Sequence, residues 1–571
     1  MPSVTEKDNQ GHIYENLLRS EADFWSFAER VEADLLGALK SAGSRTKAFG
    51  KDAHSTLALL AILRGNDAEA VHRIRLARSL CDREATRLTL HIVGEAILEA
   101  RKGPVTPEPA ETVDCFREII SALPWPTVGA QLKQLRAQLQ LLNPAIFEGV
   151  VTQHVRPSIA PDAAIERDIA HLLVRMKFNI SEVLPLCRDL ITVLDSTIDA
   201  NVKKQAPPRS VAINLGENLE LSKTIVGIWD SGVDTGFYSG KMACWSRHSI
   251  SWELDSSPGQ GSLLPIGHEN ARRYLEMSEH LAGLVDLQLG VSSVGAESFR
   301  RRVMELSSLD AVDFLERLNL ISNYVHGTHV AGTVLCGNPY ARLLSARVTW
   351  EHGLSHSLRL TRELVERQVA AYRDTVGFFQ SGGARVVNIS WNRSPTHLWE
   401  EPAQAPDATA QTCPVELDER GFFDAIAAAA DVLFVVAAGN GGIDVAEAGL
   451  YPASFRLPNV LTVGAIDAVG DDACFTNFGE VVAIYANGCG IESDIPGGRR
   501  IALSGTSMAA AQASNLAAKL LSVDPAMDPP SVIRLITTSA DISGFSGRRI
   551  LNPARSLDSL RAMRRGRDEP R

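Results

Sequence analysis

Apolar positions in residues 1 to about 205 recur at the three- and four-residue spacing of amphipathic helices. The stripes are Val71, Ile74, Ala77 and Leu80; Leu132, Leu135, Leu139 and Leu142; and Ile165, Ile169, Leu172 and Met176. Prolines interrupt the stretches between them. The pattern predicts an all-α N-terminal domain, a bundle or short solenoid, with the stripes as its core. The alternative interpretation is a regulatory or partner-binding domain, and nothing in these residues suggests chemistry.

The pattern changes after residue 206, where short and almost uninterrupted apolar runs replace the helical stripes. Such runs are typical of strands that are buried on both faces. They lie at 224–229, 343–348, 384–389, 432–437, 460–465 and 481–485, with helical stretches at 358–379, 422–430 and 507–521. The alternation predicts an α/β fold over residues 206–555: three layers, with a mostly parallel sheet covered on both faces. The proline-containing residues 205–209 are the predicted linker.

A long stretch at about 235–323 interrupts this alternation and is predicted to be an insertion. Its first part contains Trp245, Trp252, Pro258 and Gly259, which indicate loops, whereas its second part has apolar residues at helical spacing. The insertion could cover a cleft, dock the N-terminal domain or bind a partner. Residues 556–571 are predicted to be a polar tail.

Composition narrows the class of protein. The chain has 571 residues and a net charge of −11, with 45% hydrophobic and 22% charged residues, as in ordinary globular proteins. The negative charge argues against a nucleic-acid partner. No apolar stretch resembles a secretion signal or a membrane span, and the 8 cysteines form no CxxC pairs. We therefore expect a cytoplasmic protein without membrane association.

Four polar residues stand where chemistry is expected. Asp230 and Asn440 end apolar runs, and ligand sites in parallel sheets lie at the carboxyl ends of strands. His326 and Ser507 are each predicted to open a helix rich in small residues. A serine needs a nearby base to act as a nucleophile, a histidine can supply it, and a carboxylate can orient the histidine. The Asn440 carboxamide could donate a hydrogen bond to a developing oxyanion.

The motifs around these residues resemble those of the subtilisin-like serine proteases (subtilases, the S8 peptidase family). They are Asp230-Ser231-Gly232-Val233-Asp234, the stretch from His326 to Thr333 (HGTHVAGT), Ala437-Ala438-Gly439-Asn440 and Gly505-Thr506-Ser507-Met508-Ala509, in the order known for subtilisin. The resemblance covers about 210–545. It implies Asp230 as the orienting carboxylate, His326 as general base and acid, Ser507 as nucleophile and Asn440 as oxyanion donor. Asp234 and His329 are interpreted as structural.

The resemblance also implies where substrate binds. The stretch 386–391 resembles the edge strand that pairs with an extended peptide, which assigns substrate contacts to Ser390, Trp391 and Asn392, and to Gly439 beside the oxyanion donor. Asn392 replaces a glycine that is common in the family and is expected at the pocket rim. Leu450 lies near the expected pocket floor. It either points inward and makes the pocket shallow, or packs away from it.

Three departures from the family pattern qualify these expectations. After Ser507 the chain reads Met508-Ala509-Ala510-Ala511-Gln512, without the proline and histidine that are usual there. The stretch 334–342 is too short for the calcium-binding loop of many relatives, so we expect no metal and no cofactor. The N-terminal domain does not resemble the family's propeptide. The sequence predicts a serine endopeptidase acting on protein substrates and regulated by its helical domain or a protein partner; the alternative is a catalytically silent scaffold.

Overall fold

The computed structural model describes most of the chain, and these residues fall into two compact units. The described residues are 21–40, 47–81, 84–103, 107–142, 147, 167–201, 213–217, 220–291, 293–353, 361–393, 414–467, 470–543 and 546–568. Unit 1 comprises Met1–Lys203 together with Glu297–Leu315, and unit 2 comprises Lys204–Ala296 and Glu316–Arg571. The predicted linker at 205–209 lies outside the described residues. The second half of the predicted insertion is therefore divided between the units.

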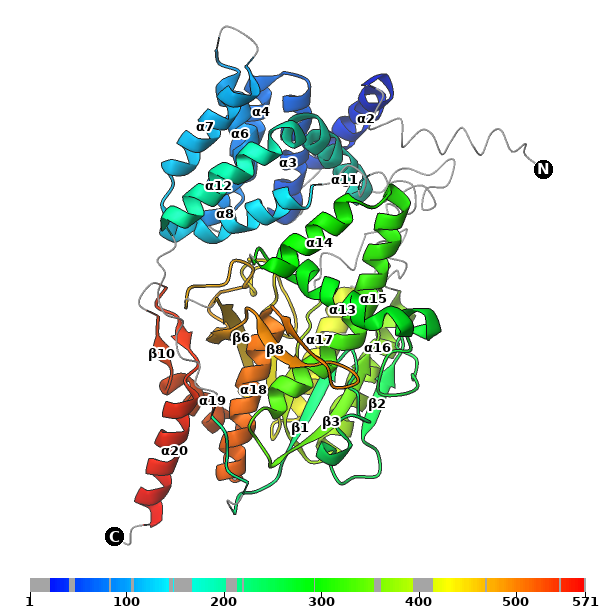
Figure 1. The fold of residues 1–571 in the computed structure, drawn as a ribbon, viewed down its shortest axis with the longest axis vertical. Coiled ribbons are helices and arrows are strands. Elements are labelled where there is room, and N and C mark those ends of the chain that lie inside the picture. The colour runs from blue at the N-terminus through cyan, green and yellow to red at the C-terminus, as the bar shows by residue number, and fades with distance from the viewer. Residues whose placement is uncertain are drawn as a thin grey trace, which may run out of the picture. The chain divides into compact units, whose positions relative to one another are not determined.

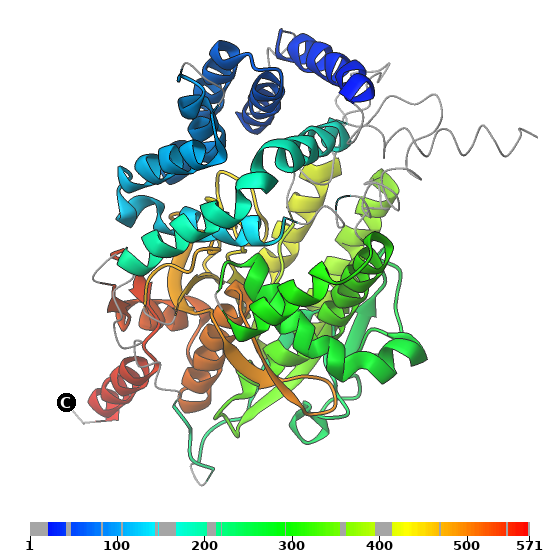
Figure 2. The same cartoon turned by 45° about the horizontal axis from the view of Figure 1, so that its top comes forward.

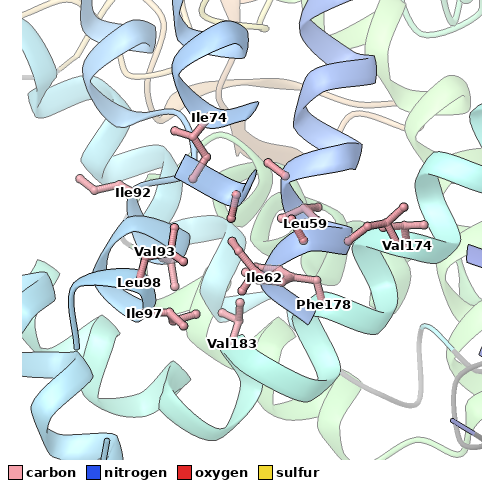
Figure 3. Packing of buried hydrophobic residues seen from close by; sticks show 14 of the residues in the cluster. Leu59, Ile62, Ile74, Ile92, Val93, Ile97, Leu98, Val174, Phe178 and Val183 are labelled. Carbon is pink, nitrogen blue, oxygen red and sulfur yellow. The ribbon is translucent and has the colours of Figure 1, made fainter. Parts of the chain in front are cut away.

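The N-terminal part of unit 1 is helical throughout its described residues, as predicted. Its elements are α2 (Glu21–Lys40), α3 (Lys47–Leu63), α4 (Asp67–Ser79), α5 (Glu84–Thr89), α6 (Ile92–Ala100), α7 (Pro109–Ser121), α8 (Trp125–Gln140), α11 (Arg167–Phe178), the short η2 (Asn179–Val183) and η3 (Leu184–Leu186), and α12 (Cys187–Asn201). The apolar stripes supply much of one buried cluster, including Ile74, Leu132 and Leu139. Figure 3 shows part of this cluster, where Ile62 of α3, Ile97 of α6 and other apolar side chains pack together.

Unit 2 is built on a nine-stranded sheet with the order β10-β11-β7-β6-β5-β4-β1-β3-β2. The pairs are parallel except for β10–β11. The strands are β1 (Thr224–Asp230), β2 (Ser249–Trp252), β3 (Ala341–Val348), β4 (Ala384–Ile389), β5 (Leu433–Ala437), β6 (Val460–Ile466), β7 (Val482–Asn487), β10 (Asp541–Ile542) and β11 (Arg549–Ile550). Each predicted apolar run is a strand, so the mostly parallel sheet is confirmed (Figure 1).

Helices cover both faces of this sheet. Successive side chains of a strand point to opposite faces, and nearly all of those in the central strands are buried, so both faces need a covering layer. Val387 and Ile389 of β4 pack in a cluster with Phe422 of α17, whereas Asn388 between them accepts a hydrogen bond from Ser514 of α18 (2.9 Å). The covering helices include α16 (Arg362–Ser381), α17 (Pro414–Ala428) and α18 (Thr506–Val523). The three-layer arrangement is the one predicted. The unusual Gln512 of α18 donates to the carbonyl oxygen of Asn487 at the end of β7 (2.5 Å), so it ties the helix to the sheet.

The described residues of the insertion contain one strand, the short 3-10 helix η4 (Ser239–Lys241) and three α-helices, the last of which continues beyond it. Its first part was predicted as loops, but Ser249–Trp252 forms β2 and pairs with β3. The prediction failed there because four residues are too short to show a pattern against the polar residues around them. The helices are α13 (Gly267–Gln288), α14 (Val294–Met304) and the 28-residue α15 (Ser308–Leu335).

A two-stranded hairpin, β8 (Ile491–Asp494) and β9 (Arg500–Leu503), leads directly into the turn before α18. The hairpin, which is orange in Figure 1 and Figure 2, lies beside the green helix α13. The chain continues through α19 (Pro529–Thr538) to α20 (Pro553–Asp568). The segment predicted as a polar tail thus begins inside a helix that buries Leu557 and Leu560. Among the described helices, none combines the length and apolar character needed to cross a bilayer.

Candidate active site

The completely buried carboxylate of Asp230 lies against the imidazole of His326. Asp230 Oδ1 and His326 Nδ1 are 2.6 Å apart, and the same oxygen accepts a hydrogen bond from the backbone N–H of Ser231 (2.7 Å). The acceptor Oδ1 fixes Nδ1 as the protonated nitrogen of a neutral ring, which leaves Nε2 as the base. This is the orientation that a serine nucleophile requires.

Glycine allows the helix of His326 to approach the end of β1 closely. A Cβ atom on Gly327 would lie 2.3 Å from the carbonyl oxygen of Gly232, so a larger residue would push the two segments apart. The Gly327 N–H donates to Ser231 Oγ (3.2 Å), and this hydroxyl donates in turn to Asp230 (3.2 Å). Ser231 was not predicted as a site residue, although it lies inside the motif that signalled Asp230.

His326 does not open a helix, contrary to the prediction. The helix begins at Ser308 and His326 lies in the second half of α15. The glycine after His326 suggested a helix start, but the preceding insertion residues already form helix, and a single glycine costs a helix only about 1 kcal/mol. The general base expected from the motif is therefore carried on a helix that starts in the insertion.

The surroundings of His326 change its proton affinity. Burial lowers the pKa of His326, but the charge of Asp230 and its hydrogen bond raise it by more, so that the pKa stands above the usual 6.5. The side chain is 23% exposed. Substrate and solvent can therefore reach a base that the carboxylate beneath it has strengthened.

Ser507 lies in the first turn of α18, as predicted. Gly505 is the N-cap with φ of 149°, a backbone conformation that favours glycine. The Ser507 hydroxyl donates to the carbonyl oxygen of Ser390 (3.2 Å), and the Ser390 hydroxyl donates to the Ser507 carbonyl (3.3 Å). Within the described residues the Ser507 hydroxyl makes no hydrogen bond to His326. In other enzymes such contacts are often long before substrate binds, so the apo geometry does not exclude Ser507 as the nucleophile.

The register of the sheet places Asp230 and Ser390 at the same end of two adjacent strands. β1 and β4 are neighbours, and Trp229 is opposite Ile389, so that Asp230 and Ser390 are the next residues along adjacent strands. Ser507 contacts Ser390, and His326 contacts Asp230. The predicted triad residues therefore gather at the carboxyl ends of parallel strands, where ligand sites in such sheets lie.

Asn440 is held by Thr506, the residue before Ser507. Its Oδ1 accepts from the Thr506 N–H and from the Thr506 hydroxyl, both at 2.9 Å, and this hydroxyl in turn accepts from the Gly439 N–H (3.0 Å). Since a backbone N–H can only donate, the oxygen of the amide is fixed and its NH₂ group faces away from Thr506. Asn440 is exposed, so this donor is available. Thr506, which was not predicted as a site residue although it lies in the motif of Ser507, fixes the orientation of Asn440.

Gly439 is required by the turn that presents Asn440. Its φ is 98°, and a Cβ atom there would lie 2.5 Å from the amide nitrogen of Asn477. Asn477 donates to the carbonyl oxygen of Ala438 (2.8 Å) and accepts from the N–H groups of Gly441 (2.9 Å) and Ile443 (3.1 Å). The sequence offered no signal for Asn477, which lies far along the chain from the turn it holds.

The predicted substrate-binding residues continue beyond β4. The expectation of an edge strand is wrong for 386–389, because β4 lies between β1 and β5. Trp391 donates from its indole to the carbonyl oxygen of Trp229 (2.9 Å). Trp229 belongs to the buried hydrophobic cluster that also contains Phe422, and Leu450 packs half-buried against that cluster. The side chain of Asn392 is bonded at both ends of its amide, to the Ala437 carbonyl and the Ala453 N–H.

Asp234 and His329 make structural contacts. Asp234 accepts from the N–H groups of Phe237 and Gly497, both at 2.9 Å. His329 is completely buried, its Nε2 donates to the carbonyl oxygen of Ile501 (3.1 Å), and burial lowers its pKa to about 4. A neutral His329 therefore links α15 to β9. In the described part of the chain, no three side chains of the metal-ligating types come together.

Comparison with known proteins agrees with this architecture. Residues 222–555, more than half of the chain, match the model of the subtilase family (Peptidase_S8). Subtilisin-like protease 7 of Trichophyton equinum is 49% identical over 90 residues, which are 16% of this chain and 21% of the relative. Subtilisin-like proteinase Mp1 of Magnaporthiopsis poae is 27% identical over 318 residues, 53% of this chain and 70% of the relative.

The matched part spans 21% to 33% of the length of the first three curated relatives. Among solved structures, a cold-adapted subtilisin-like serine proteinase matches with 17% identity and a TM-score of 0.36, over 61% of this chain and 96% of that one. The family match rests on the sequence over residues 222–555 and coincides with the sheet and the four motifs. The chain therefore belongs to the subtilase family of serine peptidases.

Proposed function

We propose that the protein is a serine endopeptidase that hydrolyses peptide bonds of protein substrates. The observation that carries the proposal is the 2.6 Å contact between Asp230 and His326, at the sheet edge where Ser507 also lies. His326 acts as base and then acid, Ser507 as nucleophile and Asn440 as oxyanion donor. No cofactor is needed for this chemistry.

The reaction follows from the hydrogen bonds of the site. Ser507 Oγ turns from Ser390 to His326 Nε2, loses its proton to it and bonds to the scissile carbonyl carbon. The carbonyl oxygen, now negative, lies between the Asn440 NH₂ group and the free N–H of Ser507 at the start of α18. His326 then returns the proton to the leaving amine, and the acyl-enzyme forms. Water repeats the steps, with His326 as base, and releases the acid.

A second candidate function is a catalytically silent scaffold on the same fold. The observation that favours it is the hydrogen bond of Ser507 to Ser390 in place of one to His326. A scaffold would keep this arrangement in every state, whereas an enzyme would leave it when peptide binds.

We propose further that the enzyme acts in the cytoplasm under the control of its helical domain or of a protein partner. The division of the insertion supports the control by the helical domain: residues 297–315 belong to the same unit as 1–203, and helix α15, which begins at Ser308, continues to His326.

Labelling with a fluorophosphonate probe tests the catalytic proposal. We expect the full chain to be labelled at Ser507, and we expect Ser507→Ala and His326→Ala to abolish labelling while the fold remains intact by circular dichroism. If the full chain is never labelled, with or without peptide or cell extract, and Ser507→Ala retains its cellular function, the scaffold is correct.

A further inference from the structure

The side chain of Asn392 forms a cross-brace between two backbone segments. Its Nδ2 donates to the carbonyl oxygen of Ala437 (2.8 Å), and its Oδ1 accepts from the N–H of Ala453 (3.1 Å). Ala437 ends β5, and Ala453 belongs to the segment after the glycine-rich turn at 439–442. Both ends of the amide are satisfied, which fixes its position.

This brace lies beside the reacting groups. The segment that carries Asn392 begins at Ser390, which contacts Ser507, and Ala437 is followed by Gly439, which contacts the residue before Ser507. A substrate carbonyl must place its carbon at Ser507 and its oxygen at Asn440. In the proposed reaction, the residue that contributes this carbonyl therefore lies next to the two segments that Asn392 joins. A Cβ atom built on Gly439 would lie only 3.7 Å from the Asn392 amide nitrogen.

The segment around Asn392 has little freedom to move outward. Arg393 donates its N–H to the carbonyl oxygen of Tyr451 (2.8 Å) and accepts from the Tyr451 N–H (3.1 Å). Its guanidinium lies 3.7 Å from the completely buried carboxylate of Asp418, which also accepts from the Tyr451 hydroxyl (2.7 Å). On the other side of Asn392, the Trp391 indole is stacked on Phe422.

We propose that Asn392 closes the space beside the oxyanion donor, so that the enzyme cleaves after glycine or alanine and rejects large residues at that position. This inference rests on the proposed peptidase function and names its substrate class. A larger side chain would have to displace the Asn392 amide and leave the Ala437 carbonyl and the Ala453 N–H without partners. Buried groups that lose their hydrogen bonds in this way give strong discrimination.

The test compares peptides that differ only in the residue before the scissile bond: glycine, alanine, leucine and phenylalanine. For the full chain we expect kcat/KM to be on the order of 100-fold higher for alanine than for phenylalanine. For Asn392→Gly we expect the ratio of kcat/KM for the alanine peptide to that for the phenylalanine peptide to fall by about 10-fold or more. Equal cleavage after all four residues by the full chain would overturn the proposal, as would an unchanged preference in a folded Asn392→Gly.

Asn459→Ala is the matched control. The Asn459 amide also bonds two backbone groups, the carbonyl oxygens of Ile426 (3.1 Å) and Ala429 (2.9 Å), but it precedes β6 at the opposite end of the strands from Ser507. Its loss is expected to reduce stability without changing the preference.

Two further measurements separate this proposal from the peptidase function. Fluorophosphonate labelling reports on Ser507 whatever peptide is preferred. Binding of the four uncleaved peptides to Ser507→Ala, measured by calorimetry, reports on the space beside Asn392 without turnover. Tighter binding of the alanine peptide than the phenylalanine peptide supports the role of Asn392 even if labelling fails, and equal binding contradicts it.

Discussion

At the scale of single residues, the Asp230–His326 pair predicts the pH dependence of activity. The carboxylate raises the pKa of His326 above 6.5, and the base must be neutral to accept the Ser507 proton. We expect kcat/KM to increase with pH along one limb, with a midpoint above 6.5. Asp230→Asn removes the charge, so the midpoint should fall while the rate drops by about 10⁴-fold.

The pH profile is measured by peptide hydrolysis, with His72→Ala as control because His72 is exposed on α4 in the helical unit. A midpoint that stays in place in Asp230→Asn would contradict the assignment. The raised pKa of His326 also makes stability depend on pH: stability falls with rising pH, whereas activity increases. A raised folded-state pKa means that the charged pair stabilises the fold fully below about pH 6.5, and that this contribution is lost as the pH rises through the folded-state pKa of His326.

Asn440 offers a second test at this scale, because the oxygen and the NH₂ group of its side-chain amide have different roles. The oxygen accepts hydrogen bonds from Thr506, and the NH₂ group is the proposed oxyanion donor. Asn440→Asp keeps an oxygen acceptor for Thr506 but replaces the NH₂ donor. We expect both Asn440→Ala and Asn440→Asp to reduce kcat by about 10²–10³-fold, with KM changed much less. If Asn440→Asp retains full activity while Asn440→Ala loses it, the residue only positions Thr506.

At the scale of elements, the predictions succeeded where burial decides the pattern. The apolar runs of β1, β4, β5, β6 and β7 are buried on both faces, so each was visible from its sequence alone. β2 was missed because it needs β3 as a partner, and β4 was taken for an edge strand because the order of strands depends on contacts between distant segments. The candidate site residues were predicted from motifs, whereas Asn477 lies in no motif and contacts the turn at 438–443 only in the folded chain.

The contact between α13 and the turn before Ser507 gives an element-scale prediction. Ser504 Oγ donates to Asp286 Oδ1 (2.7 Å) and accepts from the Gly490 N–H (3.0 Å), so helix α13 holds the end of β9. Burial raises the pKa of Asp286. We expect Asp286→Leu to reduce kcat by about 10-fold, because the loss of a positioning contact is amplified at the reacting atoms.

Asp286→Asn is the matched variant, because its amide oxygen can still accept the Ser504 hydroxyl. It should keep most of the activity and the thermal stability. Hydrolysis rates and melting temperatures of both variants check this. Equal losses in Asp286→Asn and Asp286→Leu would show that the charge of Asp286, not the hydrogen bond to Ser504, is required.

At the scale of the whole molecule, helix α15 has residues in both units. Residues 297–315 belong to unit 1, and helix α15 continues from them to His326 in unit 2. The sequence left docking of the N-terminal domain as one of three possible roles of the insertion, because contacts between segments far apart in the chain leave no pattern in it. A core substitution in unit 1 therefore tests control of the active site without touching it.

Phe116 of α7 is completely buried in the cluster of the helical domain, and Phe116→Ala is expected to destabilise that unit by about 3–5 kcal/mol. Calorimetry of the full chain should then show an earlier transition for unit 1, while unit 2 unfolds later. If unit 1 restrains His326, peptide hydrolysis by Phe116→Ala should rise above that of the unchanged chain between the two transitions, and residues 206–571 alone should show the higher rate at all temperatures. Equal rates for all three proteins would mean that unit 1 does not restrain His326, and the helical domain would then act by binding a partner or substrate.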